Sequence, residues 1–362
     1  MKFSRVWTTL ACLAAAVEAH LSKQHRERDA ASLVVSIANS PSGKSTEIQA
    51  TITNVGTVGL SALKLGTLLD DKPVKKLTVV DEDGAEVPFL GIELSLYYEG
   101  LEAEHFEYLS AGSSVTRTID VASVYDLKKG TYTVSAEGTL PTLSTGSKTT
   151  KASDFKSKAI SIVVEKASTA EVNQKLSRRT ILQNDSCTDN QRAATFNGIK
   201  NCESLARAAA ADAANPHSAR FVEYFKSNET QARNHVSGRL LAVAEECSTT
   251  DAGQTRILCK DDVGYCEEGG PLIAYTTWVN GYVVMCPLFY DTLPPLPQKC
   301  HKQDHATTTI HEMTHARAVY EQEVSTNDYA YGYENSTALD ALSCLYNADN
   351  YSLYANAVYL DC

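Results

Sequence analysis

The first half of the chain alternates between apolar and polar residues with a period of two. Alternation or runs of β-branched residues predict strands at 32–37, 47–52, 131–136 and 158–164. Gly, Ser, Asp and Pro separate these runs, which indicates an antiparallel sandwich. Nothing in this half resembles a catalytic constellation.

The second half carries the signals of helices and of one hairpin. The predicted helices are 205–214, 218–226 and 231–246. Asn280-Gly281 separates two β-rich runs, 274–279 and 282–286, and this dipeptide is the strongest short signal for a hairpin. Such a strand is either plain core sheet or an edge that pairs with a substrate backbone, and the sequence leaves both open.

The run His-Glu-Met-Thr-His at 311–315 is the most specific chemical pattern in the chain. On a helix, residues four apart lie on one face, so both imidazoles can reach a single Zn²⁺ at about 2.0–2.1 Å. H-E-x-x-H is the arrangement of zinc peptidases, in which the Glu acts as general base. The flanks 306–310 and 316–320 also fit a helix, with Asp304 as its N-cap.

Two histidines leave a zinc ion short of one protein ligand. The metzincin extension is absent, because Ala318 and Glu321 replace its Gly and its third His. The remaining candidates are Glu334, used as in thermolysin-like enzymes, and Asp328, Asp340 and Asp349. The residues alone do not choose among them.

The N-terminus has the features of a secretory signal. Lys2 and Arg5 are followed by a short apolar stretch at 6–17 and a small-residue cleavage site at 17–19. The apolar stretch is too short to span a bilayer. We therefore expect a signal peptide over residues 1–19 and a secreted, extracellular protein.

The cysteines divide the chain. Apart from Cys12 in the predicted signal, they all lie in the second half, at 187, 202, 247, 259, 266, 286, 300, 344 and 362. A secreted context favours disulfides, and because nine is odd at least one thiol is left over.

A dibasic pair, Arg178-Arg179, lies between the cysteine-free and cysteine-rich halves and is typical of a processing site. It predicts a β-rich propeptide over 20–179 and a mature domain over 180–362. Charge divides there too: residues from Thr180 onward carry 12 Lys and Arg against 23 Asp and Glu, and the remainder is balanced. The acidic mature domain has no electrostatic reason to bind nucleic acid or an anionic membrane, and weakly favours basic proteins.

The segment Ser-Thr-Asn-Asp-Tyr-Ala-Tyr-Gly at 325–332 resembles the G-T-x-D-x-x-Y-G signature that follows H-E-x-x-H in the aspzincins. Within that group the whole chain resembles the deuterolysins, which are secreted fungal zinc metalloendopeptidases. The resemblance implies a zincin-type, mainly α (α+β) catalytic domain after the sandwich-like propeptide, in a multidomain protein. Ser325 stands where the family has Gly, and a left-handed backbone there would strain a Ser.

The resemblance also assigns roles to residues. It implies one Zn²⁺ per chain held by His311, His315 and Asp328, with Glu312 as general base. Tyr331 falls on the tyrosine that hydrogen-bonds the scissile carbonyl.

The disulfides that the resemblance suggests are Cys187–Cys259, Cys266–Cys286 and Cys300–Cys362, with Cys202–Cys247 as a further pair and Cys344 free. It also implies a monomer made as a zymogen that acts on proteins, with the propeptide as intramolecular inhibitor and folding aid. Because the propeptide lacks cysteine, a thiolate cannot silence the zinc. His105 or an acidic side chain could do so, but steric blockage needs no ligand.

Two other functions compete with this interpretation. One is a zinc peptidase that uses Glu334 as ligand, and the other is a non-enzymatic secreted binding protein on a protease fold, although every catalytic residue type is present. His301 and His305 are also four apart but have no Glu between them, and Tyr290 is expected in the core. Asn184, Asn228, Asn335 and Asn350 head N-x-S/T sequons and are candidates for glycosylation.

Overall fold

A computed structural model of the chain describes residues 32–144, 150–170, 187–278, 280–320 and 324–362. The predicted signal peptide, Arg178-Arg179 and the sequon at Asn184 lie outside these residues. No helix of the described residues is long and apolar enough to cross a membrane.

The N-terminal region is built from β-strands, as predicted. They are β1 (Leu33–Asn39), β2 (Glu47–Asn54), β3 (Leu60–Leu63), β4 (Thr78–Val80), β5 (Ile92–Leu96), β6 (Phe106–Leu109), β7 (Ser114–Asp120), β8 (Gly130–Ser135), β9 (Glu137–Ser144), β10 (Lys151–Lys156) and β11 (Ile160–Val164). Three antiparallel sheets form, in the orders β1-β2-β7, β10-β9-β3-β6 and β11-β8-β4. Every second residue of β2 is buried, and three of these residues, Ile48, Ala50 and Ile52, join an apolar core that all three sheets share.

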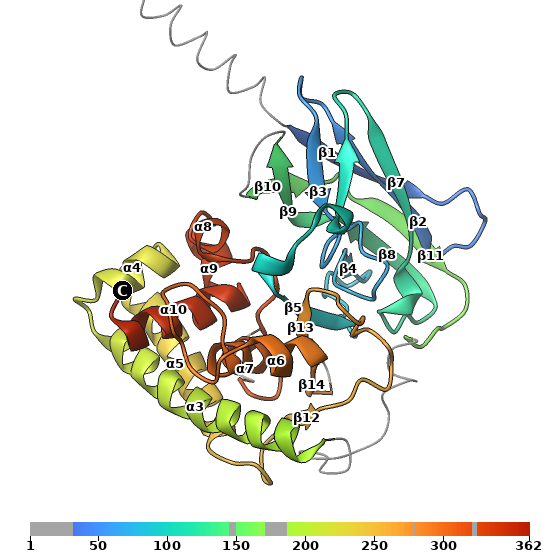
Figure 1. Cartoon of the computed structure of the whole chain (residues 1–362). Coiled ribbons are helices and arrows are strands. Elements are labelled where there is room, and N and C mark those ends of the chain that lie inside the picture. Colours follow the sequence, from blue (N-terminus) through green and yellow to red (C-terminus); the bar gives the residue numbers. More distant parts are fainter. Residues whose placement is uncertain (1–31, 145–149, 171–186, 279, 321–323) are drawn as a thin grey trace, which may run out of the picture.

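The C-terminal region is mainly helical (Figure 1). Its helices are α3 (Asp189–Ala214), α4 (Ala219–Phe225), α5 (Thr230–Cys247), α6 (Pro287–Thr292), α7 (His305–His315), α8 (Tyr333–Ser336), α9 (Ala341–Leu345) and α10 (Ala348–Leu360). Helix α3 begins well before the predicted 205–214, because Thr188 caps it and forms a capping box with Gln191. The Ala-rich buried face of α3 packs against the Val236, Leu240 and Val243 face of α5.

The predicted hairpin is present as β13 (Leu272–Thr277) and β14 (Tyr282–Met285), and β12 (Arg256–Leu258) extends it in parallel. The fourth strand of this sheet comes from the N-terminal region: the order is β12-β14-β13-β5. β13 is therefore an inner strand in this structure, and the two regions are joined through one continuous sheet (Figure 1).

The suggested disulfides are all present. The structure pairs Cys187 with Cys259, Cys202 with Cys247, Cys266 with Cys286 and Cys300 with Cys362. Cys344 is the free cysteine of the described residues and is fully buried, as the odd cysteine count required.

We predict that Cys344 does not react with a thiol reagent in the native protein. Burial raises the pKa of its thiol to about 11, so almost no thiolate forms at neutral pH, and the reagent has no access to the sulfur. Titration with a chromogenic disulfide reagent should find no thiol natively and one per mature chain after unfolding without reductant. A rapid native reaction would show that Cys344 is exposed or that one of the four bridges is open.

Candidate active site

Helix α7 carries the H-E-x-x-H run into the centre of the C-terminal region. Asp304 is its N-cap, as predicted, because its carboxylate accepts hydrogen bonds from the backbone of Ala306 (2.9 Å) and Thr307 (3.0 Å). All residues of α7 are buried, against α3, α10 and β13. A helix enclosed in this way holds its side chains in fixed directions.

The prediction that the helix continues through 316–320 is wrong. Helix α7 ends at His315, and Ala316 has an extended backbone (ψ 108°). The chain then returns alongside the helix, where Thr326 N donates to Thr314 O at 3.2 Å. If the helix continued past His315, the chain would move away from the metal group, and the loop that carries Asp328 could not return to it. Ser325 is not among the described non-Gly residues with positive φ, so the expected strain there is absent.

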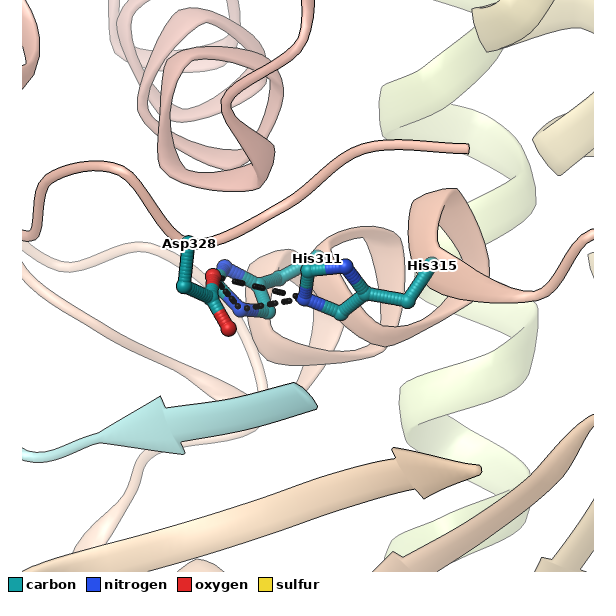
Figure 2. A group of neighbouring side chains, drawn as sticks. All are labelled: His311, His315 and Asp328. Atoms are coloured by element: carbon teal, nitrogen blue, oxygen red, sulfur yellow. Dashed lines mark hydrogen bonds and ion pairs between the residues drawn. The ribbon is translucent and has the colours of Figure 1, made fainter. Parts of the chain in front are cut away.

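His311, His315 and Asp328 converge at one point, from α7 and from the returning loop (Figure 2). Asp328 Oδ1 lies 3.2 Å from His311 Nε2 and 3.4 Å from His315 Nε2, and the two Nε2 atoms are 3.1 Å apart. All three side chains are at most 4% exposed. Among the described residues, these three side chains form a group with the spacing of metal ligands.

The second nitrogen of each ring explains why this group fits a cation. His315 Nδ1 lies 3.1 Å from the Thr326 carbonyl, which can only accept a hydrogen bond, and His311 Nδ1 lies 3.0 Å from Asp349 Oδ1. Neutral rings therefore carry their protons on Nδ1 and present lone pairs at Nε2. Two lone pairs and Asp328 Oδ1, which lacks a hydrogen-bond partner among the described residues, then face one another. A bound Zn²⁺ would satisfy all three atoms.

The electrostatics of the group show the same need for positive charge. Burial lowers the pKa of His311, but the Asp328 and Asp349 carboxylates outweigh it and raise the pKa well above its usual range. Burial raises the pKa of Asp328, but His315 and His311 outweigh it and lower the pKa below its usual range. Without a metal the site would be expected to hold a proton between the rings, and a metal ion would replace that proton.

Glu312 lies beside this group and is fully buried. Its Oε2 accepts a hydrogen bond from Thr276 Oγ1 of β13 at 2.6 Å, while Oε1 has no partner among the described residues. Burial raises the pKa of Glu312. One carboxylate oxygen is therefore held in place and the other is available to take a proton, which is the arrangement that a general base requires.

We predict that Thr276→Val lowers kcat about tenfold and leaves KM and zinc content nearly unchanged. Val keeps the shape of Thr but removes the hydroxyl, and a hydrogen bond to a charged group contributes about 1.5–3 kcal/mol. Thr276→Ser should restore most of the activity because it keeps the donor. Steady-state kinetics with zinc analysis would test this, and a full-rate Val variant would show that Thr276 does not position Glu312.

Tyr331 lies next to His311, in the loop that also carries Asp328. Its ring stacks on that of His311, with centroids 6.5 Å apart. Burial and the Asp328 carboxylate raise the pKa of Tyr331 well above its usual range, so the hydroxyl keeps its proton. The hydroxyl donates a hydrogen bond to the backbone carbonyl of Leu94, at 2.8 Å.

The loop is pinned by Asn347, whose side-chain oxygen accepts from the backbone of Tyr329 (2.9 Å) and Ala330 (3.0 Å). Asn347 is completely buried. Its amide thus fixes the backbone between Asp328, which lies at the point of convergence, and Tyr331, whose ring stacks on His311.

The other acidic candidates lie apart from the three converging atoms. Asp349 is buried behind His311 and orients its ring, a carboxylate–histidine contact typical of zinc sites. Glu334 is exposed on α8, and Asp340 caps α9. Sequence reasoning had noted Asp349 only as an alternative ligand and had missed Thr276 and Asn347. No local motif marks these three side chains.

The remaining candidates have structural partners. His305 Nε2 lies 2.8 Å from the Phe289 carbonyl, and His301 stacks on Tyr333. Tyr290 is half-buried near Thr195. Asn350 is fully buried and its Nδ2 donates to Tyr224 O at 2.6 Å, so this sequon is inaccessible in the folded chain, whereas Asn228 is exposed.

The family model described as "Deuterolysin metalloprotease (M35) family" matches residues 1–362. This chain belongs to the deuterolysin metalloprotease family. It is 40% identical to a neutral protease 2 homolog of Botryotinia fuckeliana over 327 residues, covering 88% of this chain and 90% of that protein. A neutral protease 2 homolog of Sclerotinia sclerotiorum is 41% identical over 327 residues (88% and 89%), and one of Aspergillus oryzae is 40% identical over 321 residues (88% and 89%).

Membership of the deuterolysin family makes this chain a zinc metalloendopeptidase. The alternative of a non-enzymatic binding protein is thereby set aside. The β-rich N-terminal region and the helical C-terminal region are both consistent with a zincin-like protease.

Proposed function

We propose that the chain is a secreted zymogen of a zinc endopeptidase, with residues 1–19 as signal peptide, 20–179 as propeptide and 180–362 as the mature domain. His311, His315 and Asp328 would hold one Zn²⁺. The observation that carries the proposal is the convergence of two Nε2 lone pairs and one unpartnered carboxylate oxygen within 4.8 Å of one another. The four disulfides support an oxidising, extracellular destination.

When bound, the zinc ion would lower the pKa of a water molecule and polarise the carbonyl of the peptide bond. Glu312 takes the proton of the attacking water on its unpartnered Oε1 and can return it to the leaving amine. Tyr331 donates a hydrogen bond from its hydroxyl to the carbonyl oxygen as negative charge develops there. Thr276 and Asp349 keep Glu312 and His311 in these positions.

The net charge supports a preference for basic protein substrates. Residues 180–362 carry the whole net charge of −11, and the field of an acidic domain raises the local concentration of cationic chains. The effect depends on ionic strength, so the preference should weaken as salt is added.

Zinc content and casein hydrolysis of the full chain, before and after cleavage at Arg179, would test the proposal. We expect one zinc per chain, hydrolysis after cleavage, and loss of hydrolysis when a chelator is added. A processed, folded chain that contains no zinc and cleaves nothing would overturn the proposal.

A further inference from the structure

Strand β5 of the N-terminal region lies inside the active site. It pairs antiparallel with β13, with Leu94 opposite Tyr275 and Glu93 opposite Thr276. Figure 2 shows β5, the teal arrow, passing beside Asp328. The sequence is compatible with β13 as core sheet or as a substrate-binding edge. In the structure the edge of β13 is covered by the chain's own N-terminal region.

The backbone of Leu94 makes its contacts on the side facing away from β13. Its N–H donates to Asp328 Oδ2 at 3.0 Å, and its carbonyl accepts from the Tyr331 hydroxyl at 2.8 Å. β5 therefore lies between β13 on one edge and the Asp328–Tyr331 loop on the other. A peptide substrate of a protease that binds by strand addition occupies the same kind of slot. The carbonyl of Leu94 accepts from the very hydroxyl proposed to serve the scissile carbonyl.

Glu93 brings a carboxylate from the N-terminal region to the metal group. Side chains of directly opposed residues project from the same face of a sheet, and Thr276, opposite Glu93, reaches Glu312. Glu93 is 4% exposed, and its Oε1 has no hydrogen-bond partner among the described residues. Glu93 and Asp328 line one cavity of about 680 Å³ between the two regions. Burying two carboxylates as ions is costly unless positive charge lies near them, and a bound metal ion would add to that of Lys75, which lines the same cavity.

The strand is held at both ends. At one end Trp278 N donates to Gly91 O (3.3 Å), and at the other Gln303 Nε2 donates to Leu96 O (2.8 Å). The Tyr98 hydroxyl then donates to Asp349 Oδ2 (2.7 Å), the carboxylate that orients His311. These contacts keep β5 in register against the metal group.

We propose that β5 is a built-in substrate mimic that keeps the uncleaved chain latent, with Glu93 adding a second carboxylate beside the metal group from the propeptide side. This rests on the proposed zinc peptidase function and names its regulation. The strand covers the edge of β13, and the carbonyl of Leu94 occupies the hydroxyl of Tyr331, so a substrate backbone cannot take the same place. His105, the other candidate for silencing the metal, instead accepts from Glu102 N and lies in the N-terminal region.

The first test measures how fast zinc leaves the intact chain. The full chain would carry Glu312→Gln and serine in place of Arg178 and Arg179, so that it cannot process itself. Zinc loss to an excess of chelator is then compared with and without Glu93→Gln, which keeps the size of the side chain and removes its charge. We expect release to accelerate at least about tenfold, the lower end for removal of a group that supports a metal site.

The matched control is Glu107→Gln, a propeptide carboxylate that pairs with Arg117 at the surface, and it should release zinc at the parental rate. Equal rates for the Glu93 and Glu107 variants, with unchanged circular dichroism and melting temperature, would overturn the role of Glu93. This readout needs no turnover, so it stands even if the enzyme proposal fails.

The second test needs no folded variant. A synthetic peptide of residues 90–98 is added to the full chain after that chain has been cleaved at Arg179. We expect competitive inhibition, about tenfold weaker inhibition by the peptide with Gln at position 93, and weaker inhibition when the Leu94 nitrogen is methylated. Equal inhibition by all three peptides, or none by the first while the cleaved chain hydrolyses casein, would overturn the mimic. A cleaved chain with no hydrolysis would overturn the proposed function instead.

Discussion

Glu312→Gln is expected to lower kcat for peptide hydrolysis by about 10²–10⁴-fold while zinc content and folding stay unchanged. The amide has the same size as the carboxylate and can still accept the hydrogen bond from Thr276, but it cannot take a proton from water. The three proposed metal ligands are untouched. Since the wild-type carboxylate is buried and its pKa is raised, the neutral amide should leave the melting temperature equal or higher.

Steady-state kinetics on the processed enzyme, with zinc analysis of the same samples, would measure this. Glu334→Gln is the matched control, because Glu334 is exposed on α8 and should keep full activity. A Glu312→Gln enzyme with more than a tenth of the wild-type kcat would remove Glu312 from the role of general base.

Asp328→Ala should strip zinc from the site and abolish hydrolysis with it. Removal of the carboxylate leaves two imidazoles, which is one protein ligand fewer than catalytic zinc sites use. Asp349→Ala should have a smaller effect, about 10–100-fold in metal affinity, because Asp349 contacts the ring of His311 and not the point of convergence. Glu334→Ala should bind zinc as wild type does.

Dialysis of the three processed variants against a zinc-buffered chelator, followed by metal analysis, would rank their affinities. The expected order of zinc retention is Glu334→Ala, then Asp349→Ala, then Asp328→Ala. A chain that keeps zinc without Asp328 but loses it without Glu334 would instead be a Glu-ligand peptidase. Asp349→Asn separates charge from shape, since the amide oxygen can still accept from His311 Nδ1.

Four strands of the N-terminal region, β1, β2, β8 and β11, and four helices of the C-terminal region, α3, α4, α5 and α7, could be predicted from local patterns. Period-two burial in β2 and the caps at Thr188 and Asp304 are encoded within a few neighbouring residues. Where prediction went wrong, at 316–320, a local helical preference gave way to tertiary packing. The chain had to leave α7 at His315 so that the loop with Asp328 could return to it.

Strand β5 was not predicted, although Ile-Glu-Leu-Ser-Leu alternates as a strand should. All five residues are buried, Glu93 and Ser95 included, because one face of β5 packs in an apolar cluster with Tyr275 and the other faces the metal group. Alternation in the sequence indicates a strand with one face exposed to solvent. The alternation does not indicate that another region of the chain will cover the polar face.

By itself the sequence determined the spacing of His311 and His315 on one helix face, the hairpin at Asn280-Gly281 and, through family resemblance, the position of Asp328. These depend on residues close together in the chain or on a motif that side chains spell out. Only the tertiary structure decided three hydrogen bonds of the site. They join Thr276 to Glu312, Asp349 to His311 and Tyr331 to the carbonyl of Leu94. The physical reason is that strands pair through backbone hydrogen bonds, which every residue except proline offers alike. Shape and packing therefore decide that β13 pairs with β5, a strand some 180 residues earlier in the chain.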